Sequence, residues 1–223
     1  MLLRPAAVRP AAVRPVTSIL GVLRRRQTQA DLDPSLLTSL AQGTHNPITA
    51  GLLGTPVASL VRLATVAPWG QPIYLVPYLP RTREQYRRLP AKYRGVTVAQ
   101  KVSVAVAPLS SGQAIPAAIR AGRAWASESS RGPRHPDDRF VFVVPDGVSR
   151  VALWTVTSTV AHPRPLIPRH SQPLIVNVRG NVAAFQSATF RTPGHEVWYG
   201  PTGRVVRRIA NASSCGPPLG NCA

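Results

Sequence analysis

The sequence predicts a mainly β protein, built as a small antiparallel sandwich or open barrel with a few short helices in its N-terminal half. Three observations support this prediction. Residues 140–209 contain four strand-like runs separated by turn residues, a spacing typical of sandwiches and small barrels. The 223 residues include 24 prolines, about twice the usual share of roughly 5%, and interior prolines interrupt helices. The hydrophobic content of 44% is enough for the folded core of one domain.

Residues 1–30 are predicted to form a disordered basic tail rich in Pro, Ala and Arg. The segment Arg-Pro-Ala-Ala-Val at residues 4–8 recurs at residues 9–13 and begins again at Arg14. Proline every five residues prevents a continuous helix and favours extended, solvated backbone. A targeting segment is the alternative interpretation, because the tail carries arginines and no acidic residue. Short contacts with nucleic acid or a membrane surface are a third.

A single mainly β domain is expected over residues 31–210, and it begins with short helices. Asp33 followed by Pro34 has the pattern of an N-cap and a first helical residue, so a helix is predicted over residues 34–40. Residues 43–54 are expected to form a loop. Residues 55–64 are expected to form a second helix, since their apolar side chains fall on one helical face.

The next segment combines one strand and one polar helix. The run at residues 73–78 predicts a strand, and its Pro77 favours the edge of a sheet or the end of a strand, because proline has no N–H for the ladder. A short polar helix is predicted over residues 82–93. Thr82 and Gln85 have the spacing of a capping box, which places the start of this helix.

The middle of the chain predicts one further strand followed by a long loop. Residues 95–107 alternate in part between apolar and polar side chains, which indicates β structure. Residues 110–138 are rich in Ser, Gly, Pro and Arg, and a loop of this length inside a domain is either functional or disordered. A short amphipathic helix could lie within it at residues 114–125.

Four strands are predicted in the last third of the chain. They cover residues 140–144, 148–156, 174–184 (broken at 179–181) and 196–209 (broken at 200–203). Residues 145–147 and 200–203 have the composition of hairpin turns. Asp146 in the first of these turns is expected to play a structural role by bonding to local backbone.

Five segments of the chain carry a family resemblance. The motifs VPDGVSRVALW, VNVRGNVAAFQ and VWYGPTGRVVRRI occur in this order, downstream of LRRRQTQADLDPSLL and VRLATVAPWGQPIYLVPYLP. Together they resemble a family of exported or membrane-anchored proteins from high-GC Gram-positive bacteria with no known activity, and the resemblance covers most of residues 20–209. It implies no catalytic residues. Such proteins carry an anchor or signal ahead of the segment matching residues 20–31. We therefore expect an extracytoplasmic protein if the true start lies upstream of Met1, and a cytoplasmic one if Met1 is the true start.

The two cysteines, Cys215 and Cys222, lie in a predicted C-terminal tail over residues 211–223. The residues between them are rich in turn formers, so the two thiols can meet. A disulfide there would contribute about 2.5 kcal/mol by the chain-entropy relation, provided that the compartment is oxidising. Two free thiols in a disordered tail are the alternative. No histidine lies nearby to complete a zinc site.

No catalytic, cofactor or metal site is predicted, and the chain is expected not to be an enzyme. The eight acids include no recognisable opposed pair, and the adjacent Asp137 and Asp138 are flanked by arginines, so solvation or ion pairing is expected. His162 and His170 could converge with His195 on a metal ion, but loop or surface positions are favoured. Neither a nucleophile elbow nor a phosphate-binding glycine loop occurs. A hydrolase with its site in the long loop remains an alternative.

Charge is the feature that best indicates function. The chain has 27 Lys and Arg residues against eight Asp and Glu, a net charge of +19, which attracts polyanions at long range. We therefore expect a non-enzymatic structural or binding module of the cell envelope that interacts with anionic polymers or a membrane surface. A nucleic-acid-binding protein that uses the same arginines is the alternative. The residues expected to contact the polyanion lie in three runs: Arg24, Arg25, Arg26, Arg87, Arg88, Arg204, Arg207 and Arg208.

Overall fold

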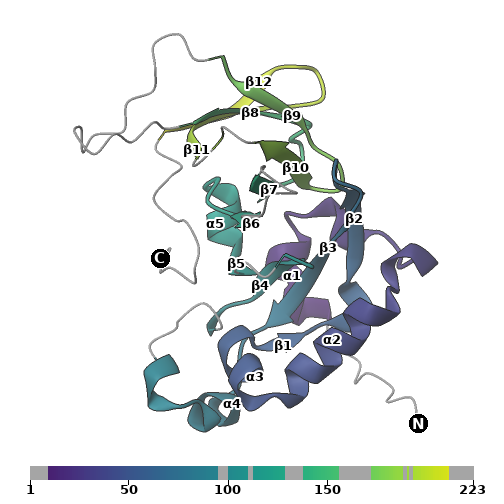
Figure 1. Cartoon of the computed structure of the whole chain (residues 1–223), viewed down its shortest axis with the longest axis vertical. Helices are drawn as coiled ribbons and strands as arrows, with labels where there is room; N and C mark the ends of the chain where they lie inside the picture. Colours follow the sequence, from purple (N-terminus) through teal and green to yellow (C-terminus); the bar gives the residue numbers. More distant parts are fainter. Residues whose placement is uncertain are drawn as a thin grey trace, which may run out of the picture.

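A computed structural model describes residues 10–94, 100–109, 113–128, 138–155, 172–187, 190 and 193–210. Across these residues the protein is mainly β, with twelve strands in three antiparallel sheets and five short α-helices (Figure 1). Most of the helices lie in the N-terminal half, and the described strands do not close into a barrel. The predicted fold class is confirmed. No helix in this part of the chain is long and apolar enough to cross a lipid bilayer.

The first sheet is built around β3 (Pro72–Leu79). One side of β3 pairs with β2 (Arg62–Val66) and then with β1 (Thr55–Pro56), and the other side pairs with β4 (Ser103–Ala107), which continues to β5 (Gln113–Ala114). Both faces of β3 are covered, because six consecutive residues in it are buried. A continuous apolar run is the pattern expected of such a strand.

Pro77 lies inside this sheet, so the prediction of an edge or a strand end is wrong. The Val57 N–H donates to the Pro77 carbonyl oxygen at 2.8 Å. The amide nitrogen and carbonyl of a strand residue face the same neighbouring strand. The N–H that proline lacks would therefore point to the place where β1 has ended and the 3₁₀ helix η3 (Ala58–Leu60) leads to β2.

The predicted strands of residues 140–209 are confirmed, but they are divided between two sheets. The second sheet has the order β10 (Val182–Ser187), β7 (Asp138–Val143), β6 (Trp125–Glu128). The third has the order β12 (Val205–Ala210), β11 (Pro193–Tyr199), β8 (Arg150–Thr155), β9 (Leu174–Asn177).

Residues 145–147 do not form the predicted hairpin, because β7 and β8 belong to different sheets and these residues carry the chain from one to the other. Residues 179–181 carry it back from β9 to β10. Residues 200–203 do close a hairpin, between β11 and β12. Turn composition therefore predicted where the chain changes direction. It did not predict which strands pair, because the pairing depends on contacts between residues far apart in the sequence.

Three apolar layers hold the sheets together. The second and third sheets pack face to face around aromatic side chains, with Phe140, Phe142 and Phe185 on one sheet and Trp198 on the other. The opposite face of the second sheet packs toward the first sheet, with the N-terminal segment and α5 (Pro116–Arg120) between them. The outer face of the first sheet is covered by α2 (Pro34–His45) and α3 (Pro47–Leu53) (Figure 1).

The predicted disordered tail is wrong for residues 10–24, which form α1 (Pro10–Thr17) and the 3₁₀ helix η1 (Gly21–Arg24). Their apolar side chains recur every three or four residues and are fully buried in the central core: Val13, Val16, Leu20 and Leu23. The five-residue proline repeat masks this helical spacing in the sequence. Pro10 starts the helix, at a position where an N–H group would have no acceptor within the helix. Pro15 removes one hydrogen bond from a helix of eight residues. Residues 1–9 lie outside the described residues.

The cap predicted for α2 is confirmed, because Asp33 Oδ1 accepts from the Ser35 and Leu36 N–H groups at 2.8 and 3.0 Å. The loop predicted over residues 43–54 is wrong: α2 continues to His45, and Asn46 then caps α3. The second predicted helix, residues 55–64, is also wrong. Its residues form β1, η3 and the start of β2, because pairing with β3 overrides the local helical spacing.

The capping box of α4 (Arg83–Arg88) is confirmed, since the Thr82 hydroxyl accepts from the Gln85 N–H while the Gln85 side chain accepts from the Thr82 N–H. The described part of the long predicted loop is more regular than expected. It contains β5, the short helix α5 and β6, so a helix does lie within residues 114–125. Residues 110–112 and 129–137 lie outside the described residues.

Candidate functional site

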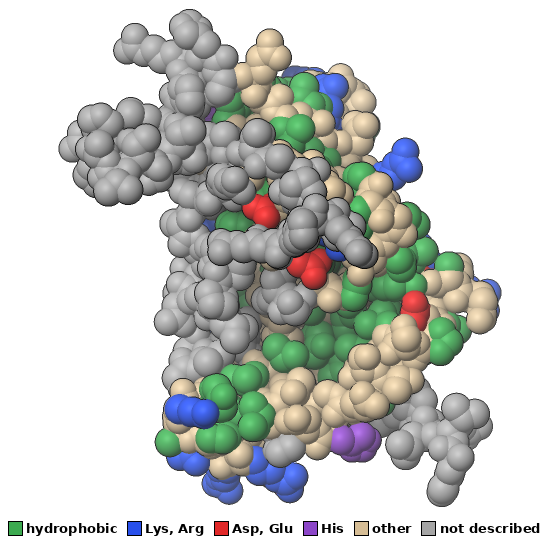
Figure 2. Space-filling model, viewed as in Figure 1, with side chains coloured by type: hydrophobic (Ala, Val, Ile, Leu, Met, Phe, Trp, Pro, Cys, Tyr) green, Lys and Arg blue, Asp and Glu red, His purple; other side chains and the backbone are tan. Residues whose placement is uncertain are grey.

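A group of cationic side chains lies at one end of the molecule, on α4 and the 3₁₀ helix η4 (Ala91–Tyr93). Residues 81–94 contain six basic residues and one acid, a net charge of +5. Figure 2 shows basic side chains gathered at this lower end of the visible face. We call this group the α4–η4 surface; it consists of Arg81, Arg83, Tyr86, Arg87, Arg88, Lys92, Tyr93 and Arg94.

A single apolar residue fixes α4 to the domain. Leu89, directly after the helix, is 1% exposed, and its side chain lies so close to Gly51 of α3 that a Cβ there would stand 2.5 Å from the Leu89 Cγ. Arg81 adds a hydrogen bond from Nη1 to the Gly51 carbonyl at 3.1 Å. Within the helix, Gln85 Nε2 also donates to the Thr55 hydroxyl at 3.2 Å. The helix is therefore held at its ends and at Gln85, and its charged residues are exposed.

Several cations of the α4–η4 surface are available for a partner. Arg88 pairs with Glu84 on the same helix, whereas Arg83, Arg87 and Lys92 are exposed and have no acidic partner within the described residues. An exposed aromatic ring lies among them. Tyr86 is 39% exposed, and the Arg81 guanidinium lies 4.8 Å from its ring centre.

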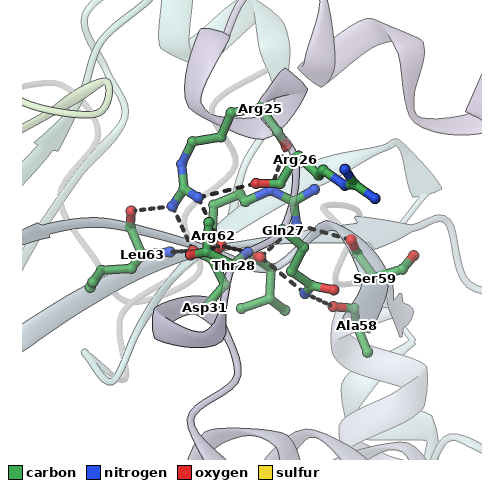
Figure 3. A network of polar contacts seen from close by, with 10 residues as sticks. Arg25, Arg26, Gln27, Thr28, Asp31, Ala58, Ser59, Arg62 and Leu63 are labelled. Atoms are coloured by element: carbon green, nitrogen blue, oxygen red, sulfur yellow. Dashed lines mark hydrogen bonds and ion pairs between the residues drawn. The ribbon is translucent and has the colours of Figure 1, made fainter.

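Two of the arginines predicted to bind polyanions have structural partners instead. Arg25 donates to both carboxylate oxygens of the fully buried Asp31, at 2.8 and 2.5 Å (Figure 3). The N–H groups of Thr28 and Leu63 also donate to that carboxylate, at 2.7 and 2.6 Å. Burial opposes ionisation of Asp31, but these hydrogen bonds outweigh it and lower the pKa well below its usual value. The network attaches the N-terminal segment to β2.

The second arginine with a structural partner is Arg24, which pairs with Asp146. The Asp146 carboxylate accepts from the Gly21 N–H at 2.5 Å, the Arg24 guanidinium at 2.7 Å and the Asn181 side-chain amide at 3.0 Å. Burial raises the pKa of Asp146, but the bonds from Asn181 and Arg24 outweigh this and lower it. The structural role expected for Asp146 is confirmed, although its partners are remote rather than local.

The three predicted arginine runs do not form one surface. Arg26 is exposed beside the network just described, and Arg87 and Arg88 belong to the α4–η4 surface. Arg204, Arg207 and Arg208 lie exposed at and beside the edge strand β12, at the opposite end of the molecule from α4 (Figure 1).

A groove of about 540 Å³ lies between α2 and the first sheet. Figure 2 shows hydrophobic side chains gathered on the face that carries α2. A space of this size is typical of sites for small molecules. The apolar walls are formed by Leu36 and Leu40 of α2, Leu53 of α3, and Tyr74, Val76 and Tyr78 of β3.

The predicted histidine and cysteine sites fall largely on undescribed residues. His162, His170, Cys215 and Cys222 lie outside the described residues, as does Asp137. His195 is described, and its ring packs edge-on against Trp154 with 5.2 Å between ring centres. Within the described part of the chain, no three His, Cys, Asp or Glu side chains lie close enough together to hold a metal ion.

Sequence reasoning missed two buried acids: Asp31, described above, and Glu196 on β11. Glu196 is fully buried and accepts from the Trp198 indole N–H at 2.9 Å, while its other carboxylate oxygen has no hydrogen-bond partner within the described residues. Burial raises its pKa to about 7. Strand alternation was the available signal, because residues 196 and 198 share one face of a strand and Trp198 belongs to the core.

Comparison of the chain with models of known protein families, with curated proteins and with solved structures finds no match. The family resemblance drawn from the sequence motifs stays a prediction. The functional conclusions below therefore rest on the geometry of the α4–η4 surface and of the groove.

Proposed function

We propose that the protein is a non-enzymatic binding module that attaches to anionic polymers of the cell envelope through its α4–η4 surface. The observation that supports this function is the group of exposed cations Arg83, Arg87 and Lys92, which have no acidic partner in the described part of the chain. Their helix is anchored by a buried residue, so the charges are held in place before a partner arrives.

The physical basis of such binding is phosphate neutralisation. Each cation that contacts a phosphate releases condensed counterions, so affinity falls steeply as salt rises. The net charge of +19 adds a long-range attraction that brings a polyanion to the protein without selecting where it binds. Binding of this kind requires exposed positive charge and no catalytic pocket. The envelope location comes from the sequence resemblance.

A nucleic acid is the second candidate partner, and the exposed ring of Tyr86 favours it. Bases stack on aromatic side chains whatever their sequence, with about 1–3 kcal/mol lost per base when the ring is removed. Tyr86 lies among the cations of the α4–η4 surface, with the guanidinium of Arg81 beside its ring. A ring in this setting can stack on a base while its neighbours contact phosphates.

The test compares two triple variants that remove the same charge at opposite ends of the molecule. One carries Arg83→Gln, Arg87→Gln and Lys92→Gln; the matched control carries Arg204→Gln, Arg207→Gln and Arg208→Gln. Affinity for poly(glycerol phosphate) is measured across a salt series. We expect the first variant to reduce the slope of log K against log salt by about 2–3, and the control to change it by less than about 1.

Equal losses in the two triple variants would overturn the proposed surface, since they would show that the charge acts as a diffuse coat. Single-stranded DNA and RNA are titrated in parallel with Tyr86→Ala. The nucleic-acid candidate requires Tyr86→Ala to weaken binding to these strands by about fivefold or more, with no effect on poly(glycerol phosphate). An unchanged affinity for the strands removes that candidate.

A further inference from the structure

The groove under α2 has a charge opposite to that of the protein around it. Within the described lining the one charged side chain is Asp33, and neither lysine nor arginine contributes. This is notable in a chain with 27 basic residues and eight acids. The groove therefore disfavours the anionic partners that the α4–η4 surface is expected to attract, and it is a separate site.

Small residues on β4 keep the groove open. Two alanines, Ala105 and Ala107, stand opposite Val76 and Tyr74 in the β3–β4 register, so β4 presents only methyl groups beneath α2. The helix does not close the gap. None of the residues of α2 is buried, although Leu36 and Leu40 face the sheet. When part of the apolar face of an amphipathic helix is uncovered, another apolar group normally packs against it.

The shape of the groove follows β3. Its lining includes Asp33 and Tyr74 toward one end, with Gln71 and Pro72 beyond them, and Tyr78 and Gln113 toward the other. The four-residue separation of the two tyrosines corresponds to about 13 Å of strand. A slender hydrocarbon or aromatic body can lie along this length against the leucines of α2.

The Asp33 end provides an ionised carboxylate. Oδ1 is occupied by the cap of α2, while the one hydrogen bond to Oδ2 from within the described residues comes from the Tyr74 hydroxyl, at 3.4 Å, which is the long limit of a hydrogen bond. Hydrogen bonds from Ser35 and Leu36 lower the pKa of Asp33, so it is charged at neutral pH. A cation above Oδ2 would gain a charge-assisted hydrogen bond.

The opposite end offers neutral hydrogen-bonding groups. Gln113 donates from Nε2 to the Leu53 carbonyl at 2.8 Å, but its buried Oε1 has no partner among the described residues. Burial raises the pKa of the Tyr78 hydroxyl, so this group stays uncharged. This end can therefore hold an uncharged polar tip and provides no counter-charge for an anion.

We infer that the groove binds a small hydrophobic amine, with the ammonium group at Asp33 and the apolar body along β3. This inference is independent of the proposed polyanion-binding function. Charge distinguishes the ligands of this groove from the partners of the protein as a whole. The net charge of the protein favours anions, whereas Asp33 makes the groove favour cations.

Calorimetric titration of the full chain with octylamine, octanol and octanoate tests the inference, because the three probes share one hydrocarbon chain. We expect octylamine to bind about fivefold or more tightly than octanol, and octanoate to bind most weakly. Octanoate binding as tightly as octylamine would overturn the inference. So would a failure of octylamine to bind at millimolar concentrations.

Two variants assign the binding to the groove. Asp33→Asn keeps an equally good N-cap but removes the charge, so octylamine should lose about fivefold in affinity while octanol is unchanged. Ala105→Phe fills the groove and should abolish binding of all three probes. If Ala105→Phe fails to fold, Ala107→Val provides a smaller obstruction for the same measurement. Unchanged octylamine affinity in Asp33→Asn would contradict the assigned orientation and overturn the inference.

Discussion

Glu196 shows how one buried residue can make the stability of the protein depend on pH. Its side chain lies on the inner face of the third sheet, where a Cβ added at Gly122 would stand 3.2 Å from its Oε2. One oxygen is satisfied by Trp198 and the other has no partner in the described part of the chain. Because burial raises the pKa to about 7, the folded protein holds a proton that the unfolded chain releases near pH 4.5.

The sign of the effect follows from this raised pKa. The protonated carboxyl favours the folded state fully below the unfolded pKa, and this contribution is lost as pH rises through the folded pKa. We expect the free energy of unfolding to fall by about 3 kcal/mol from this group between about pH 4.5 and about pH 7. Urea unfolding of the native protein and of Glu196→Gln measures it. The variant should lack the decline, and parallel pH profiles would refute the prediction.

Asp31 acts in the opposite direction at lower pH. Its pKa is lowered in the fold, so its contribution is present above the unfolded value of 3.8 and is lost as pH falls below it. Together the two residues predict that the free energy of unfolding is highest at a pH above the titration of Asp31 and below the titration of Glu196. The pair of the half-exposed Arg25 and the buried Asp31 could not be recognised from the sequence, since Arg25 lies in a run of three arginines that resembles an exposed patch.

At the scale of elements, the N-terminal helix is a part of the core rather than an appendage. Leu20 follows α1 and is fully buried among residues of the first and second sheets. Leu20→Ala should therefore lower the free energy of unfolding by about 3 kcal/mol, the usual cost of a cavity left by a buried leucine. Denaturant unfolding checks this against Arg26→Ala, an exposed neighbour. Equal stability of the two variants would mean that the segment does not dock.

Local signals predicted the elements whose cause is local. The Asp33 cap and the Thr82–Gln85 capping box correctly marked helix starts, because a cap involves residues within one turn. The apolar run at residues 73–78 marked a strand. The failures involved distant partners: residues 55–64 have helical spacing but pair with β3, and the turn at 145–147 connects two sheets.

The groove could not be predicted for the same reason. Asp33 was identified as a helix cap, and the partial alternation in residues 95–107 indicated the strand that forms β4 at its C-terminal end. The sequence does not indicate that Ala105 and Ala107 face Leu36 and Leu40 of α2 across an open space. The α4–η4 surface, in contrast, was partly predictable, since several closely spaced arginines on a short polar helix have few ways to become buried.

At the scale of the whole molecule, the net charge of +19 opposes compactness. Among the described residues several acids already pair with arginine, so most of the excess positive charge has no counterpart. Self-repulsion of this kind weakens as salt shortens the range of electrostatic interactions, from about 30 Å at about 0.01 M to about 10 Å at about 0.1 M.

We therefore expect the thermal midpoint to rise when NaCl is increased over this range. Differential scanning calorimetry in NaCl provides the measurement, and the triple variant at Arg204, Arg207 and Arg208 should show a smaller rise because it carries three fewer charges. A midpoint that falls with salt would mean that screening of ion pairs such as Arg24–Asp146 outweighs relief of repulsion.

The long-range contacts of the N-terminal segment have a consequence for how the protein is made. The Gly21 N–H bonds to Asp146, 125 residues away, and the Val22 N–H bonds to Asn181, 159 residues away. At a translation rate of about 5–20 residues per second, the segment is synthesised about 6–32 s before those partners. Its apolar face can contact the first sheet earlier, but its contacts with the second sheet cannot be complete before that interval ends, so a chaperone that shields the nascent chain should raise the yield of folded protein.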